Sequence, residues 1–209
     1  MVRDKELEQY AATLYSDTLP YHNFTHALQC IEAGHELVRR CREEGVAIDE
    51  HVVYYALLFH DAGYHEDHFG KGYPTKEAYS AALAEAALNQ RGVAPATVQQ
   101  VTAAILATRR DARFVSVEEK AVRAADLSGL AADYGVFRAN TEKLKYEYEI
   151  MTGGPISWDE WIAMADEVVS YFLSQDIRLT RYYFDESGDS IFHKRTMANL
   201  NRLRAERGA

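Results

Sequence analysis

The segment from Glu50 to Asp61 reads EHVVYYALLFHD, and it decides the fold class. Apolar residues occupy almost every side of the helix that this segment would form, which is typical of a central, buried helix and not of a surface helix. Gly63 follows as a helix stop. The sequence therefore predicts one core helix with other helices packed around it.

The segments on both sides carry helical signals as well. Apolar residues recur at spacings of three, four and seven between residues 22 and 44, and capping residues or a proline mark the starts of other helices. No internal repeat, long linker or sustained β alternation interrupts this pattern. We expect an all-α, single compact multi-helix domain over residues 1–209, with helices at about 4–17, 22–44, 50–61, 76–90, 95–108, 117–132, 134–151, 158–185 and 190–207.

Composition and charge narrow the function classes. The chain has 209 residues, of which 23 are Lys or Arg and 32 are Asp or Glu, so the net charge is −9. An acidic chain is poorly suited to binding nucleic acid or anionic membranes. No apolar run approaches the roughly 20 residues that span a bilayer, and the N-terminus lacks the apolar stretch of a signal peptide. Neither nucleic acid nor a membrane is an expected partner.

The two cysteines predict a reducing compartment. Cys30 and Cys41 fall eleven residues apart in one predicted helix, so their Cα atoms would lie about 16 Å apart. That distance is too long for a disulfide. We expect a cytoplasmic protein with free thiols.

Histidines and isolated carboxylates fall at unusual positions of the helical pattern. His22 and His26 are four residues apart, which would put both on one helical face. His60 and Asp61 end the apolar helix, and Asp126 stands alone in the run AADLSGL. A carboxylate at a helix C-terminus meets the negative end of the helix dipole, and burial without a partner adds a further cost. A bound divalent cation would offset both penalties.

Two imidazoles and two carboxylates form a mixed nitrogen and oxygen ligand set at His26, His60, Asp61 and Asp126. This set suits Mn, Fe, Co, Ni or Zn, and Mg less well. It leaves coordination positions for water and substrate, as a catalytic metal requires. We therefore expect these four residues to bind a divalent metal ion.

The order of these residues resembles the signature of a known family. His26, then the dipeptide His60-Asp61, then Asp126, with intervals of 34 and 65 residues, is similar to the H…HD…D signature of the HD-domain superfamily. Members of that superfamily are mostly metal-dependent phosphohydrolases. The resemblance covers about residues 20–130, which would form the metal-site core, with C-terminal helices at about 134–207.

A second, local resemblance concerns the heptapeptide YHNFTHA at residues 21–27. It is similar to the signature of cyclic-nucleotide phosphodiesterases, in which the second histidine binds metal and the first protonates the leaving oxygen. The resemblance implies that His26 is a ligand and His22 a proton donor. It does not extend to the substrate, because this chain is much shorter and shows none of that family's extra pocket elements.

The number of metal ions is predicted from a departure from the family. Binuclear relatives often carry further histidines between the HD dipeptide and the last aspartate, whereas residues 101–113 (VTAAILATRRDAR) contain none. We therefore expect one ion per chain. His65 and His68, in the loop after the apolar helix, are the alternative source of a second site.

Several other residues are weaker candidates. Glu77 and Ser80 resemble a Glu-x-x-Ser-Ala pattern of bacterial HD proteins and would support the ligands. Cys30, four residues after His26, could face the metal, but a small buried core cysteine is the more common case. Four cations are candidate phosphate contacts, with a solvated surface as the alternative: Lys71, Lys76, Arg109 and Arg110.

Together these features predict a metal-dependent phosphohydrolase that acts on a nucleotide or another small phosphoester. A metal-activated water would attack phosphorus in line. Asp61 or Asp126 would orient or deprotonate that water, and His22 would protonate the leaving oxygen. The identities of the substrate and the metal, and the oligomeric state, stay open.

Two alternatives belong to other classes. A minority of HD-like folds hold two irons and act as oxygenases, although the absence of histidine from residues 101–113 argues against this activity. The second alternative is a metal-binding but non-catalytic module in regulation or assembly. The complete ligand set and the presence of His22 favour an enzyme over such a module.

Overall fold

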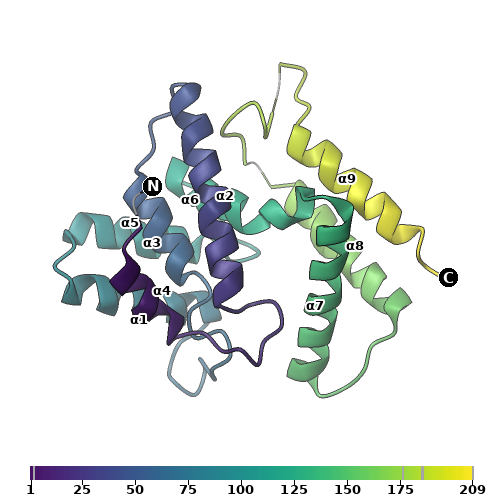
Figure 1. Cartoon of the computed structure of the whole chain (residues 1–209), viewed down its shortest axis with the longest axis horizontal. Helices are drawn as coiled ribbons and strands as arrows, with labels where there is room; N and C mark the ends of the chain where they lie inside the picture. The colour runs from purple at the N-terminus through teal and green to yellow at the C-terminus, as the bar shows by residue number, and fades with distance from the viewer. Residues whose placement is uncertain (2, 176, 185, 209) are drawn as a thin grey trace. The chain divides into compact units, whose positions relative to one another are not determined.

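The computed structural model of the chain describes residues 1, 3–175, 177–184 and 186–208. Every regular element in these residues is a helix, which confirms the predicted all-α class (Figure 1). The chain divides into two compact units, Met1–Asp126 and Leu127–Ala209. The expected single domain over residues 1–209 stays a prediction. None of the helices in the described residues is long and apolar enough to cross a bilayer.

The first unit is built around its third helix. That helix packs against all five of the other helices in the unit, and six of its residues, Val52, Val53, Ala56, Leu57, Leu58 and Phe59, are fully inaccessible to solvent. The predicted central helix is therefore confirmed. The helices of this unit are α1 (Lys5–Ala12), α2 (Phe24–Glu43), α3 (Glu50–Phe59), α4 (Lys76–Gln90), α5 (Pro95–Leu106) and α6 (Val117–Asp126).

A glycine allows α2 and α3 to approach each other closely. A Cβ atom added to Gly34 of α2 would collide with Cδ1 of Leu57 and lie 3.4 Å from Cγ1 of Val53 on α3. Overpacking of a core in this way costs about 1–3 kcal/mol. Gly34 therefore sets the distance between the two helices that carry the histidines of the candidate site.

Side-chain caps fix where the helices of the first unit begin. The carboxamide oxygen of Asn23 accepts the backbone N–H groups of Thr25 and His26, at 3.0 and 3.3 Å. The Oγ1 atom of Thr75 accepts the N–H of Ala78 at 3.1 Å, as its sequence position predicts. Such caps are worth about 1 kcal/mol each. The Asn23 cap places His26 in the first turn of α2.

The predicted helix over residues 4–17 is too long at its C-terminal end. It ends at Ala12, with Thr13 as the cap. Farther along, the Oγ atom of Ser16 accepts the N–H of Thr18 at 3.2 Å. A local bond of this kind offers the backbone an alternative to the helix. The chain then leads through residues 20–22 to the start of α2.

In its described residues, the second unit contains a 3₁₀ turn and three α-helices. These are η1 (Leu127–Ala131), α7 (Tyr134–Thr152), α8 (Trp158–Leu173) and α9 (Ile191–Arg204). Phe137, Ile162 and Leu203, from the three α-helices, form a buried cluster. The hydroxyl of Ser157 and the carboxylate of Glu160 each accept the other residue's backbone N–H, which forms a capping box at the start of α8.

Two predicted helices end earlier than expected, one at the boundary between the two units and one within the second unit. The predicted helix 117–132 is α-helical only to Asp126, and residues 127–131 continue as the 3₁₀ turn, a common helix ending for which Ser128 and Gly129 are suited. The predicted helix 158–185 ends at Leu173. Thr180 and the aromatic residues at 182–184, farther along the predicted helix, are weak helix formers and do not support its extension to residue 185.

Candidate metal centre

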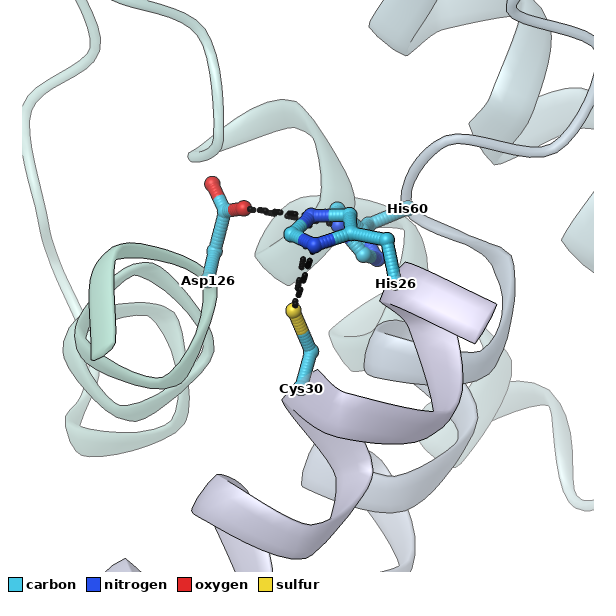
Figure 2. Close-up of side chains that lie close together, drawn as sticks. All are labelled: His26, Cys30, His60 and Asp126. Atoms are coloured by element: carbon cyan, nitrogen blue, oxygen red, sulfur yellow. Dashed lines mark hydrogen bonds and ion pairs between the residues drawn. The ribbon is translucent and has the colours of Figure 1, made fainter. Parts of the chain in front are cut away.

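The four predicted ligands meet at one place within the first unit. His26 lies in the first turn of α2, His60 and Asp61 directly follow α3, and Asp126 is the last residue of α6. His60 and Asp61 are 2% and 6% exposed, and His26 is 5% exposed. Figure 2 shows the two histidines, Asp126 and Cys30 turned toward one another. Three separate helices thus deliver polar side chains to one buried point.

The distances between the donor atoms fit a single metal ion. Nε2 of His60 lies 3.1 Å from Oδ2 of Asp61 and 3.5 Å from Oδ1 of Asp126. Nε2 of His26 lies 3.7 Å and 3.4 Å from the same two oxygens. Two ligand atoms bound at about 2.0–2.1 Å in a tetrahedral arrangement lie roughly 3.3 Å apart. These four histidine-to-aspartate separations are close to that spacing, although Asp61 does not belong to the group of donor atoms that all lie within 4.8 Å of one another.

Two of these buried atoms have no hydrogen-bond partner among the described residues. They are Nε2 of His60 and Oδ2 of Asp61, which lie within ion-pair distance of each other. On the other side of the ring, Nδ1 of His60 lies 2.8 Å from the carbonyl oxygen of Leu57 and is placed to donate its proton there. That arrangement leaves Nε2 as the nitrogen that faces the carboxylates. Because an unsatisfied buried polar atom costs about 1–3 kcal/mol, a bound cation fits this site.

Cys30 also belongs to the cluster. Its Sγ atom lies 3.5 Å from Nε2 of His26, one turn earlier on α2, and Figure 2 shows the thiol directed at that ring. Donor atoms of His26, Cys30, His60 and Asp126 all lie within 4.8 Å of one another, so these four residues could hold a metal ion. From the sequence, packing in the core was the more common role expected for Cys30, and metal binding the less common one. Its spacing of four residues from His26 was the available signal.

The charges of the cluster shift the protonation of its members. Burial alone would lower the pKa of His26, but Cys30 and Asp126 raise that pKa to about 10. Burial also opposes a charge on His60, yet Asp61 and Asp126 hold the pKa of His60 well above its ordinary value. The histidines in turn outweigh burial and keep the pKa of Asp61 and of Asp126 well below the usual range. The carboxylates thus favour the protonated form of both rings, and the rings favour the ionised form of both carboxylates.

Two cationic side chains flank the carboxylates. Arg123 is 2% exposed, and its Nη1 atom lies 3.6 Å from Oδ2 of Asp126, while its Nη2 atom donates to the carbonyl oxygen of Arg109. Nζ of Lys76 lies 3.9 Å from Oδ1 of Asp61 and 3.8 Å from the centre of the Tyr64 ring. Lys76 was a candidate from the sequence, but Arg123 was not. The signal that could have indicated Arg123 is its position three residues before Asp126, close to one helical turn away.

His22 lies beside the cluster but not on the helix that was predicted to carry it. Helix α2 begins at Phe24, so the expectation that His22 and His26 share a helical face was wrong. Asn23 is the N-cap and has an extended conformation, so the helix begins only after it and does not include His22. The ring of His22 is nevertheless centred 5.8 Å from the ring of His26, and it stacks on Tyr64 at 4.2 Å.

The remaining candidates divide between the centre and the surface. Glu77 is buried, with Oε1 3.9 Å from Nζ of Lys76, and the Ser80 hydroxyl donates to the carbonyl oxygen of Ala62 at 2.8 Å. Both thus brace the segment around Asp61. The other cations and the loop histidines are placed differently: Lys71 pairs with Glu66, Arg109 pairs with Asp111, Arg110 and His65 are exposed, and His68 contacts the ring of Phe69.

Comparison with known proteins leaves this geometry as the main guide to function. No known protein family and no curated protein matches the sequence. The resemblance to the HD-domain superfamily therefore stays a prediction that rests on the ordered histidines and aspartates. Among the described residues, His65 and His68 belong to no group of His, Cys, Asp and Glu side chains that could hold a second ion.

Proposed function

We propose that the protein is a metal-dependent phosphohydrolase that acts on a nucleotide or another small phosphoester. One observation carries the proposal: two histidines and two aspartates from three helices meet in a buried cluster in which Nε2 of His60 and Oδ2 of Asp61 have no hydrogen-bond partner. Buried carboxylates beside imidazoles are costly unless a cation compensates them. The H…HD…D order of the same residues supports hydrolysis as the reaction class.

His26, His60, Asp61 and Asp126 would hold the ion, and the neighbouring residues would serve the substrate. A divalent ion held there supplies a Lewis acid that lowers the pKa of water and offsets charge on phosphoryl oxygens. Asp61 or Asp126 would orient or deprotonate the attacking water, and the contact of Asp61 Oδ1 with the half-exposed Lys76 supports Asp61 for this role. Arg123, which lies beside Asp126, holds that carboxylate in position.

His22 and Lys76 would meet the phosphoester. Both contact the ring of Tyr64, the imidazole by stacking at 4.2 Å and the ammonium at 3.8 Å. Both are partly exposed, as is Asp126, whereas His26, His60 and Asp61 are buried. In this arrangement Lys76 would neutralise a phosphoryl oxygen and His22 would protonate the leaving oxygen, a role worth about 10²–10⁴ in rate for a general acid.

A loading and turnover experiment tests this function. Protein purified without added metal is loaded in turn with Mn²⁺, Fe²⁺, Co²⁺, Ni²⁺, Zn²⁺ or Mg²⁺, and phosphate release is measured on nucleoside monophosphates, cyclic nucleotides, guanosine polyphosphates and aryl phosphates. We expect turnover with at least one ion and substrate, and its loss in His60→Ala. No turnover on the whole panel, with one ion bound per chain, would overturn the proposal.

A metal-binding, non-catalytic module is the second candidate function, and the position of Cys30 favours it. His26, Cys30, His60 and Asp126 offer four donor atoms, and a closed set of four protein ligands is typical of structural zinc sites. The same loading experiment separates the two candidates. A silent module would bind metal and gain stability from it, while all substrates stay intact.

A further inference from the structure

Cys30 gives the cluster a chemical character that histidines and aspartates alone lack. Its Sγ atom lies 3.5 Å from Nε2 and 3.8 Å from Nδ1 of His26, and the residue is 2% exposed. Residues four apart lie on one face of a helix, so α2 presents an imidazole and a thiol to the same point. A packing role alone would not require the sulfur to lie among donor atoms.

The spacing of the sulfur matches a coordination shell. With metal–sulfur and metal–nitrogen bonds of about 2.3 and 2.0–2.1 Å, tetrahedral ligands lie roughly 3.5–3.6 Å apart. The observed separation between Sγ of Cys30 and Nε2 of His26 is 3.5 Å. Independently, the buried Nε2 of His60 has no hydrogen-bond partner, and it belongs to the same set of atoms within 4.8 Å.

We propose that Cys30 is a metal ligand through Sγ and that it makes the centre prefer Zn²⁺ or another thiophilic divalent ion over Mn²⁺ and Mg²⁺. Thiolates select zinc and similar ions, whereas Mn²⁺ and Mg²⁺ favour oxygen ligands. The thiol proton leaves to solvent when the sulfur binds. This inference rests on the metal centre of the proposed function but does not require hydrolysis. With Cys30 bound beside His26, His60 and Asp126, hydrolysis would need a further coordination position for water.

Cobalt spectroscopy tests the sulfur bond directly. Co²⁺ is titrated into metal-free wild-type protein, Cys30→Ser and Cys41→Ser. Cys41 is the matched control because it is a fully buried thiol on the same helix, eleven residues farther along. We expect a near-ultraviolet sulfur-to-cobalt charge-transfer band at one equivalent in the wild type and Cys41→Ser, and no such band in Cys30→Ser. A band that survives in Cys30→Ser would overturn the assignment.

Metal competition tests the selectivity. The three proteins are equilibrated with equimolar Zn²⁺ and Mn²⁺, and the bound metals are measured by mass spectrometry. Loss of a residue that merely orients a ligand typically costs 10–100-fold in affinity, so loss of a direct ligand should lower the Zn²⁺ affinity of Cys30→Ser by at least about tenfold. Mn²⁺ affinity should change far less. An unchanged Zn²⁺-to-Mn²⁺ ratio would contradict the proposal.

A measurement on the unmodified protein guards against a variant that fails to fold. X-ray absorption of the zinc-loaded wild type should show a sulfur scatterer at about 2.3 Å, and a shell of nitrogen and oxygen alone would refute sulfur ligation. The outcome is independent of turnover. A sulfur-ligated zinc without hydrolysis of any phosphoester would leave this inference standing while the proposed function fails.

Discussion

Nδ1 of His60 lies 2.8 Å from the carbonyl oxygen of Leu57, one helical turn earlier in the chain. A proton on Nδ1 satisfies the carbonyl at the end of α3 and leaves Nε2 as the nitrogen that faces Asp61 and Asp126. The apolar interior that surrounds Leu57 therefore determines which nitrogen of the candidate ligand is presented. Packing in the core and chemistry at the site are joined through this one contact.

That connection predicts a coupled effect of Gly34→Ala. The new methyl group would press on the Leu57 side chain, so we expect a loss of about 1–3 kcal/mol in unfolding free energy. We also expect weaker metal binding, since Leu57 orients His60. Chemical denaturation and metal titration measure the two effects.

The matched control for this variant is Gly135→Ala on α7. A methyl group there meets nothing within 4 Å, and alanine is the better helix former by about 0.5–1 kcal/mol. Stability should stay the same or rise, and metal affinity should not change. Equal destabilisation by both variants would show that the close contact between α2 and α3 is unimportant.

Removal of the metal should lower thermal stability. An ion that binds only the folded state stabilises it by about 2.7 kcal/mol at a free concentration of 100 times Kd. We expect a lower Tm after chelation and recovery when the ion is restored, measured by calorimetry with metal content confirmed. An unchanged Tm after verified metal loss would count against a metal centre that compensates Asp61 and Asp126.

Metal binding should strengthen as pH rises. In the metal-free protein the pKa of His26 is raised to about 10, so its proton stabilises the fold fully below the ordinary histidine pKa of about 6.5. This stabilisation is lost as pH rises through about 10. A metal ion must displace that proton, and affinity should rise by up to about tenfold per pH unit for each proton displaced.

Calorimetric titration in two buffers of different ionisation enthalpy measures this proton release directly. The increase in Tm on adding metal should also become larger between pH 6.5 and 9. This range lies between the ordinary histidine pKa of about 6.5 and the raised pKa of His26 in the folded protein, about 10. Binding that releases no protons would mean that His26 and His60 are neutral before the ion arrives, contrary to their raised pKa.

His22 and His26 should differ in what their loss removes. His26→Ala should lose both metal and activity, because a ligand is gone. His22→Ala should keep the metal and lose roughly 10²–10⁴ in kcat on a substrate with an alkoxide leaving group. It should be much less impaired on an aryl phosphate, whose phenolate leaves without a proton.

Metal analysis and paired kinetics decide between the roles of these two histidines. Equal losses of kcat on the alkyl and aryl substrates, with metal retained, would remove the acid role from His22 and leave it a positioning residue on Tyr64. Loss of metal in His22→Ala would make His22 a ligand.

Much of the fold could be predicted because its signals are local. The apolar run of α3, the Thr75 cap and the Ser157–Glu160 capping box each act within one or two turns of the chain, and the structure contains all three. The end of α8 could not be placed in this way. Residues after Leu173 alternate between helix-compatible and weakly helical types, so no single stop signal marks the boundary.

In the candidate site, too, the sequence indicates some residues and leaves others undistinguished. His26, His60, Asp61 and Asp126 were predicted because charged or polar groups in apolar helical contexts are conspicuous in a sequence. Four cations near the site in sequence looked alike, however, and only packing distinguishes Lys76 beside Asp61 from Lys71, which pairs with Glu66. Periodicity describes which face of a helix a residue occupies, but not what the next helix brings to it.

The predicted ligands lie in or directly after three helices that are far apart in the chain: His60 is 34 positions after His26, and Asp126 is 65 positions after Asp61. Contacts of such separation form late, because the entropy of closing the intervening loops must be overcome first. We therefore expect an ion to bind only after α6 has docked, so that metal uptake during refolding would report the completion of tertiary assembly. A chain still in synthesis would have no complete site until Asp126 has emerged.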